Sequence, residues 1–328
     1  MSMQIPVRVL GTGSYLPAER VTAEQLDQRL GLAPGTALSR NGVQTRYFVN
    51  ESETASAMSE SAIRRALEAS GMAVGDLDAI LFSGVMSEQP MPCTAVLIHK
   101  RLGGRNEGVT CFDINASCGG FLKGLEIAAA GIQCGLWTRV AVAAAELASK
   151  GLRWDDPDTC TLFGDGAAAA VLGPAGGTEG IVRVRSATWS EGAALSTMVA
   201  GGSRYNMRTP PPDPDDYLFA MQGRGLLRLI QMHFSSFLNP LLSPEVGLIV
   251  PHQASAVGLA FLRKHLAARE GPAPEVIDIL RETGNQVSVS VPFALDHAIR
   301  TQALRRGDTA LLLCTAAGVA FSGVVLRY

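Results

Sequence analysis

The sequence has little charge, few aromatic residues and no long apolar run. Of its 328 residues, 18% are charged and 6% are aromatic, and the formal net charge is only −2. A nearly neutral chain carries no global electrostatic sign of binding nucleic acid or an anionic membrane surface. In addition, no apolar stretch is long and charge-free enough to cross a bilayer. From these two observations together, we expect neither nucleic acid nor a membrane as a partner.

Closely paired cysteines are also lacking. The six cysteines lie at positions 93, 111, 118, 134, 160 and 314 and form no CxxC pair. In a chain of this size, such thiols are typical of a reduced cytosolic protein rather than of a disulfide framework. Residues 1–17 contain one arginine and only a short apolar run. We therefore expect no targeting peptide and a cytoplasmic location.

Apolar periodicity alternates between helices and strands along the chain. It predicts helices over 54–70, 94–102, 217–238 and 255–268, and strands over 79–83, 140–144, 244–250 and 309–314. The residues at 11–14 predict a turn and those at 32–41 a loop. Similar units recur in the same order on both sides of a glycine-rich turn at 174–180. The sequence therefore predicts a duplicated α/β fold with halves 1–174 and 175–328.

The stretch from Cys111 to Leu125 joins a strand-like apolar run to a helical pattern that begins after Cys118. Gly119 and Gly120 at the helix start would let a substrate or a neighbouring element approach the backbone. A thiol there faces unpaired amides and the positive end of the helix dipole, which favour the thiolate. Cys118 is therefore a candidate nucleophile. The alternative is a small buried apolar residue, which is common for a lone cysteine.

Two polar residues of the second half occupy comparable strand ends. His252 follows a strand that Pro251 ends, and Asn285 lies in a turn after Gly284. Sites in open α/β sheets form outside the carboxyl ends of the strands, so these side chains could converge on Cys118. Cysteine can attack a thioester carbonyl, while histidine and asparagine tune the thiolate or donate to a developing oxyanion. A structural histidine and an ordinary turn asparagine remain the alternatives.

The joint pattern of motifs resembles β-ketoacyl-acyl-carrier-protein synthase III, of the thiolase-like superfamily. The resemblance rests mainly on three motifs, DINASCGGF at 113–121, VPHQAS at 250–255 and GNQVSVSVP at 284–292. Supporting matches are LGTGSYLP at 10–17, LFGDGAAAAVL at 162–172, MQGR at 221–224 and AAGVAFSGVVLRY at 316–328. The resemblance runs the whole chain. It implies a thiolase-like five-layer α-β-α-β-α fold of two similar halves, and a homodimer.

The resemblance also implies a reaction. Cys118 would accept an acyl group from acyl-CoA or an acyl-carrier protein. His252 and Asn285 would bind malonyl on an acyl carrier protein and stabilise the enolate formed as carbon dioxide leaves. The oxyanions would be held by the backbone amides of Cys118 and Ala317. No metal or nicotinamide cofactor is needed, because thioester cleavage and decarboxylation drive the reaction.

Departures from the family pattern concern the acyl donor. Thr36 stands where family members that use acetyl-CoA have a tryptophan, although Arg40 is kept, and acids around 156–159 replace a second arginine. Arg40 and Gly223 fall at the implied substrate entrance, and Met91 at the gate of the partner subunit's acyl pocket. The polar, proline-rich residues 201–216 could form an entrance or lid. We infer a specialised acyl donor rather than the acetyl-CoA primer.

Basic residues on two expected helices offer a docking surface for an acidic carrier protein, through electrostatic steering. They are Arg224, Arg228, Arg263 and Lys264. An ordinary solvated helix face is the alternative.

Two other functions stay open. The first is an acyltransferase that passes the acyl group from Cys118 to an acceptor other than malonyl, and the second is a non-catalytic partner subunit. The presence of His252 and Asn285 together favours condensation, since simple transfer has less need of an asparagine donor. Primary fatty acid synthesis, a secondary-metabolite starter step and a cofactor-precursor step are all compatible with the sequence.

Overall fold

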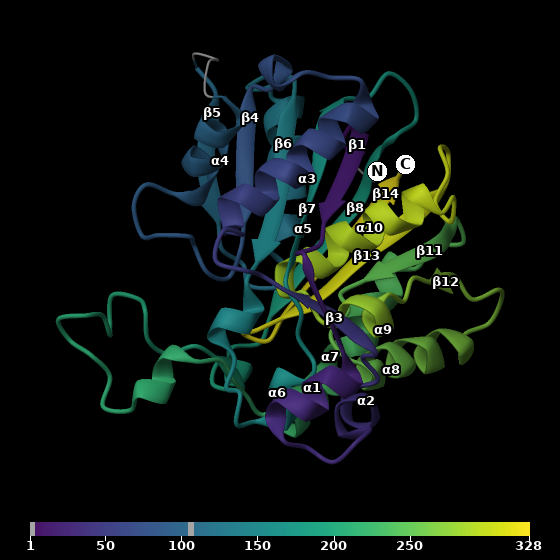
Figure 1. Cartoon of the computed structure of the whole chain (residues 1–328). Coiled ribbons are helices and arrows are strands. Elements are labelled where there is room, and N and C mark those ends of the chain that lie inside the picture. Colours follow the sequence, from purple (N-terminus) through teal and green to yellow (C-terminus); the bar gives the residue numbers. More distant parts are fainter. Residues whose placement is uncertain (1–3, 104–107) are drawn as a thin grey trace.

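The computed structural model describes residues 4–103 and 108–328 and contains two five-stranded sheets (Figure 1). The first has the order β1 (Val7–Tyr15), β7 (Gly166–Pro174), β6 (Val140–Glu146), β4 (Ala79–Ser83), β5 (Thr110–Ile114). The second has the order β8 (Gly180–Thr188), β14 (Ala320–Arg327), β13 (Thr309–Ala316), β11 (Val246–Pro251), β12 (Glu275–Val276). Residues 1–3, which belong to the N-terminal stretch 1–17 where we expect no targeting peptide, lie outside the described residues.

The two sheets repeat one topology. In the first, β4 runs parallel to β5 and β6, whereas β7 is antiparallel to β6 and β1. In the second, β11 runs parallel to β12 and β13, whereas β14 is antiparallel to β13 and β8. This repetition confirms the predicted duplication into similar halves. A division into two domains at residue 174 stays a prediction.

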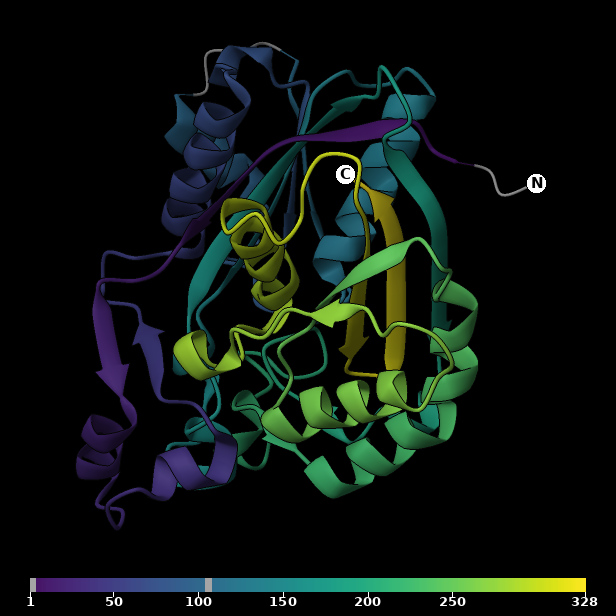
Figure 2. The same ribbon diagram turned by 90° about the vertical axis from the view of Figure 1, so that its right-hand side faces the viewer.

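Three pairs of helices complete five layers (Figure 2). The central pair, α5 (Gly120–Gln133) and α10 (Ser290–Arg300), shares one apolar core with both sheets. Helices α3 (Ala55–Ser70) and α4 (Thr94–Leu102) pack on the outer face of the first sheet. Helices α7 (Gly223–Leu238) and α8 (Ala256–Ala267) pack on that of the second. The predicted five-layer α-β-α-β-α fold is confirmed.

Local signals explain why α3 forms where the sequence predicts it. The Thr54 side chain caps its start by accepting a hydrogen bond from the Ala57 amide, at 3.3 Å. Met58 and Ile63 are fully buried on one face. Gly71, in the left-handed conformation, ends the helix.

The predicted turn at 11–14 is wrong, because these residues lie inside β1. A β-carbon added at Gly11 would lie 2.2 Å from the Ala66 carbonyl oxygen, and one at Gly13 would lie 2.5 Å from that of Ala62. Both oxygens belong to α3. The glycines therefore let a helix pack closely on the strand instead of turning the chain.

Two other boundaries differ from expectation. The expected loop at 32–41 contains the helix α2 (Thr36–Asn41). The helix expected from residue 217 begins only at Gly223, because Ala220–Met221 forms β10 and pairs with β9 (Ser196–Thr197). The remaining elements are short: β2 (Glu19–Thr22), α1 (Ala23–Leu30), β3 (Thr45–Phe48), α6 (Pro157–Cys160), α9 (Leu280–Thr283), and the 3₁₀ turns η1 (Val74–Asp76), η2 (Ala148–Gly151), η3 (Ser190–Gly192), η4 (Pro214–Tyr217), η5 (Asn239–Leu241) and η6 (Val287–Val289).

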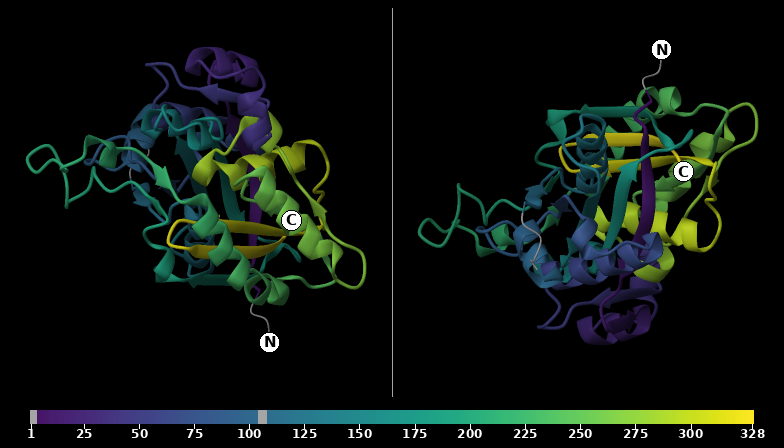
Figure 3. Two further views of the ribbon diagram at one scale, coloured as in Figure 1. Left: turned by 90° about the horizontal axis from the view of Figure 1, so that it is seen from below. Right: turned by 90° about the horizontal axis from the view of Figure 1, so that it is seen from above.

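The expected entrance segment, residues 201–216, projects away from the two sheets (Figure 3). Within residues 4–103 and 108–328, no helix is long and apolar enough to cross a membrane.

Candidate active site

Cys118 lies at the sharp turn between β5 and α5. Ser117 has a φ angle of 49°, in the left-handed region that residues other than glycine seldom adopt. The Asn115 side chain supports this turn by accepting a hydrogen bond from the Ser117 amide, at 3.1 Å. The turn places the cysteine at the start of α5, as the sequence predicts.

The two glycines after the cysteine bring α5 close to both sheets. A β-carbon added at Gly120 would lie 2.9 Å from Ser83 Cβ, at the end of β4. One added at Gly119 would lie 3.5 Å from Ser322 Oγ, on β14 of the other sheet. A side chain at position 120 would therefore push the start of α5 away from β4, whereas position 119 lies at ordinary contact distance from β14.

Two backbone amides act on the Cys118 thiol. They belong to Cys118 itself and to Ala317, which follows β13, and both lower the pKa of the thiol by hydrogen bonding. Burial and the charge of Glu146 nevertheless raise this pKa to about 12. The amide at the helix start acts in the expected direction, but desolvation outweighs it, so the helix start alone does not keep Cys118 as a thiolate.

His252 is held at the end of β11 by a strand-pairing contact. Its backbone amide donates to the Leu313 carbonyl oxygen, at 2.7 Å. The imidazole is 7% exposed, and burial lowers its pKa to about 4. The side chain is therefore neutral near pH 7. Within the described part of the chain, its Nδ1 atom has no hydrogen-bond partner.

Asn285 is oriented by the loop that follows His252. Its Nδ2 donates to the Ala254 carbonyl oxygen at 3.1 Å, and its Oδ1 accepts from the Val287 amide at 2.8 Å. Because Ala254 lies two residues after His252, the carboxamide and the histidine loop are directly connected.

Strand β13 brings the cysteine and the histidine to one place. Pro251 pairs with Leu313, so His252 follows the strand beside Cys314. Burial and, second to it, the charge on Cys118 raise the pKa of the Cys314 thiol. Cys118 therefore follows β5 of the first sheet and His252 follows β11 of the second, and the end of β13 connects them at the junction of the two halves. Asn285, after α9, is joined to the His252 loop through Ala254. The roles assigned to the three residues stay predictions.

Glu146, which the sequence analysis missed, also lies at this junction. Its side-chain Oε1 accepts hydrogen bonds from the Val85 amide at 2.9 Å and from Ser288 Oγ at 2.5 Å. The residue is 4% exposed, and burial, with the charge of Asp165, raises its pKa to about 7. A lone carboxylate at the end of the fully buried strand VAVAAAE is the sequence signal that could have identified it.

At the expected entrance, Arg40 on α2 is already paired. Its guanidinium forms an ion pair with Asp158, which belongs to the acidic segment 156–159. Thr36 is the first residue of the same helix, and Gly223 is exposed at the start of α7. Met91, the expected gate, is 84% exposed in this single chain.

The four basic residues of the expected docking surface lie on neighbouring helices. The rings of Phe234 on α7 and Phe261 on α8 are 5.0 Å apart. The exposed residues Arg224, Arg228, Arg263 and Lys264 lie on these two helices. Arg263 is paired with Asp278 at 2.8 Å.

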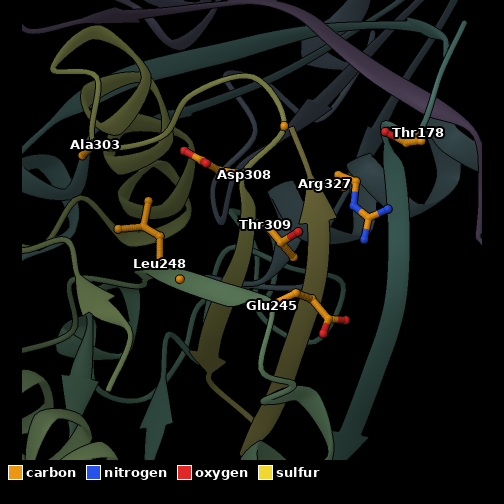
Figure 4. A pocket seen from close by; sticks show the side chains of 9 residues that line it. Thr178, Glu245, Leu248, Ala303, Asp308, Thr309 and Arg327 are labelled. Carbon is orange, nitrogen blue, oxygen red and sulfur yellow. The ribbon is translucent and has the colours of Figure 1, made fainter. Parts of the chain in front are cut away.

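A cavity of about 520 Å³ lies elsewhere, at the amino ends of β11 and β13. Figure 4 shows Glu245, Asp308 and Arg327 among the residues around it. His252 follows the opposite end of β11, so this cavity is not part of the candidate active site.

Comparisons with known proteins agree with the geometry. Residues 112–192 match the family described as 3-oxoacyl-[acyl-carrier-protein (ACP)] synthase III, and residues 239–328 match its C-terminal part. A β-ketoacyl-[acyl-carrier-protein] synthase III of Methylococcus capsulatus is 33% identical and covers 98% of both chains. One of Caldanaerobacter subterraneus is 31% identical, covering 100% of this chain and 99% of the relative.

Solved structures give the same result. The 3-oxoacyl-[acyl-carrier-protein] synthase III of Aquifex aeolicus has a TM-score of 0.84 and 29% identity, covering 98% of this chain and 100% of its own. The priming β-ketosynthase of the R1128 polyketide pathway has a TM-score of 0.88 and 28% identity, and the match covers 99% of this chain and 97% of that ketosynthase. The resemblance inferred from the motifs is thus confirmed, and this chain belongs to the β-ketoacyl-acyl-carrier-protein synthase III family.

Proposed function

We propose that the protein condenses an acyl group bound to Cys118 with malonyl on an acyl carrier protein, releasing carbon dioxide and forming a β-ketoacyl thioester. The observation that carries this proposal is the end of β13: the Ala317 amide just after it acts on the Cys118 thiol, and Leu313 within it pairs with the end of β11 that holds His252. Asn285 is joined to the same loop through Ala254. No metal or nicotinamide cofactor is proposed, since the two substrates contain the driving force.

In the acylation step, the Cys118 sulfur attacks the carbonyl carbon of the donor thioester. The pKa of about 12 means that the attacking group starts as a thiol and loses its proton as the new carbon–sulfur bond forms. The amides of Cys118 and Ala317 hold the oxyanion in this step. The bond to the donor sulfur then breaks, and the released thiolate takes up the proton.

In the condensation step, the malonyl carboxylate leaves as carbon dioxide, and its electron pair forms an enolate on the thioester. The neutral imidazole of His252 can donate one hydrogen bond to the enolate oxygen. Asn285 uses only one N–H for Ala254, so the other remains for the same oxygen. The enolate carbon attacks the acyl carbon, the bond to Cys118 breaks, and the released thiolate takes up a proton from water.

The acyl donor is proposed to be delivered without recognition of a nucleotide. The ion pair with Asp158 neutralises Arg40, and Thr36 offers no ring for stacking on adenine. A donor on a carrier protein fits such an entrance better than a coenzyme A ester. When the same acyl group is offered on coenzyme A and on the carrier protein, kcat/KM should be higher for the carrier-protein thioester. Asp158→Ala, which frees Arg40, should improve the coenzyme A ester selectively.

The carrier protein is proposed to dock on α7 and α8, where Arg224, Arg228 and Lys264 are exposed. The acidic surface expected of a carrier protein would complement these charges. Reversing Arg224 and Arg228 to glutamate should raise KM for the carrier substrate and leave the reaction with a small thioester unchanged.

A homodimer is proposed to form along β5. In the part of the chain that the structure describes, this strand ends the first sheet and one of its edges pairs with no other strand, and Cys111–Ile114 are only partly buried. A second copy would cover this edge and bring Met91 of one protomer toward the acyl pocket of the other. Sedimentation should show a dimer.

The six free cysteines suit a reducing compartment, and the cytoplasm is the proposed location.

Intact-mass measurement tests the function in two stages. The protein is first incubated with acyl thioesters, and the wild type but not Cys118→Ala should gain the mass of the acyl group. Carboxyl-labelled malonyl-carrier protein is then added, and labelled carbon dioxide should be released. Acyl uptake without release of carbon dioxide would favour the alternative acyltransferase. If the protein neither took up the acyl group nor released carbon dioxide, a non-catalytic subunit would be favoured.

A further inference from the structure

Glu146 occupies a position that the proposed reaction does not yet explain. Its buried carboxyl group joins three segments: it ends β6, accepts the Val85 amide after β4, and accepts the Ser288 hydroxyl of η6. Ionised carboxylates are seldom buried without a cationic partner. Both of these hydrogen bonds end on Glu146 Oε1, and an amide and a hydroxyl do not neutralise a charge.

The carboxyl group lies at the same sheet edge as the nucleophile. Ser83 pairs with Ala144, two residues before Glu146, and also lies against the start of α5 at Gly120. Consistent with this placement, the charge of Glu146 acts on Cys118 and raises the pKa of the thiol, second only to burial.

The same group also holds the loop that carries Asn285. Ser288 lies three residues after Asn285, is itself fully buried, and donates to Glu146 at 2.5 Å. The Val287 amide between them donates to Asn285 Oδ1. A displacement of Ser288 would therefore be transmitted to the carboxamide.

We propose that Glu146 is a positioning residue for the reaction proposed above. Its carboxyl group fixes the Asn285 loop against β6, and its charge opposes formation of the Cys118 thiolate. A proton on Glu146 therefore makes the thiolate easier to form, so the two groups titrate as a coupled pair. The other titratable groups around the pair are Asp165 beside Glu146, Cys314 beside Cys118, and His252 at the end of β11.

The test is the rate at which iodoacetamide alkylates Cys118 between pH 6 and pH 10, followed on the Cys118 peptide by mass spectrometry. Glu146→Gln removes the charge and keeps an oxygen for Val85 and Ser288. Its profile should lie about one pH unit lower than that of the wild type. Glu126→Gln, on the helix that follows Cys118 and paired with Lys123, is the matched control and should leave the profile in place.

The wild type provides a second readout that needs no variant. The logarithm of its alkylation rate should rise with pH, flatten where Glu146 loses its proton near pH 7, and then rise again. An uninterrupted rise through this range, or a Glu146→Gln profile that coincides with the wild type, would overturn the proposal. Alkylation requires neither malonyl nor a carrier protein, so its result is independent of whether the protein condenses thioesters.

Ser288→Ala tests the mechanical part of the proposal. It leaves the carboxyl group beside Cys118 but removes the hydroxyl that connects it to the Asn285 loop. Carbon dioxide release by the acylated protein should slow more than tenfold, with a smaller effect on acylation. Equal effects on the two steps would overturn the role assigned to this hydrogen bond.

Discussion

Replacing Glu146 by glutamine should stabilise the folded protein in alkaline solution. In the unfolded chain this carboxyl group has the ordinary pKa of 4.5, whereas burial raises the pKa to about 7 in the folded state. Between these values the unfolded state releases a proton that the folded state keeps, so stability falls as pH rises. Above pH 7 the folded protein carries the full cost of a buried carboxylate. Glutamine has no proton to lose and avoids that cost.

The magnitude follows from the change in pKa. At about 1.4 kcal/mol for each pH unit, the penalty at pH 8 is about 3 kcal/mol, and most of it is absent at pH 5. The unfolding free energy of Glu146→Gln minus that of the wild type should therefore grow by roughly 2 to 3 kcal/mol from pH 5 to pH 8. Any effect of the new amide on packing is present at both pH values and cancels.

The assay is reversible unfolding in urea, followed by tryptophan fluorescence at one protein concentration, because the proposed dimer would make stability depend on concentration. Glu126→Gln is the control, and its difference from the wild type should change little with pH. A Glu146→Gln difference that stays constant from pH 5 to pH 8 would refute the reasoning. It would mean that the carboxyl group titrates alike in both states.

Four further outcomes are expected. Cys118→Ala should take up no acyl group by intact mass; label on another residue would contradict its role. Asn285→Ala should keep acyl uptake but release carbon dioxide on the order of 10²-fold more slowly. Because His252 is buried in neutral form with a pKa of about 4, acidification from pH 6.5 to 4 should cost about 3 kcal/mol of stability, and His252→Gln should remove that cost. Gly13→Ala should cost more than about 2 kcal/mol in urea unfolding, whereas Gly176→Ala, with nothing within 4 Å, should change stability by less than about 0.5 kcal/mol.

Local sequence signals predicted much of the fold. Helix α3 follows from its cap at Thr54, its apolar face and Gly71, all of which act within one segment. The role of Gly11 and Gly13 could not be predicted in this way. Their need for space comes from the backbone of α3, some 50 residues later in the chain, and only the packed structure brings the two together.

The site likewise combines features that local sequence signals predict with features that depend on contacts between distant segments. Cys118 and His252 lie in short segments whose strand and helix ends can be recognised in the sequence. The protonation state of Cys118 depends also on burial and on Glu146, which the helix start alone does not reveal. Glu146 was missed because its contacts, Val85 and Ser288, are distant in sequence.

The most direct test of the central claim is the mass of the carrier protein after one turnover. Acylated wild-type protein is mixed with malonyl-carrier protein, and both proteins are weighed intact. The malonyl carboxyl group should be replaced by the acyl group on the carrier, while Cys118 returns to the free thiol. A carrier that keeps its malonyl group while the acyl group leaves Cys118 for another acceptor would contradict the proposed condensation.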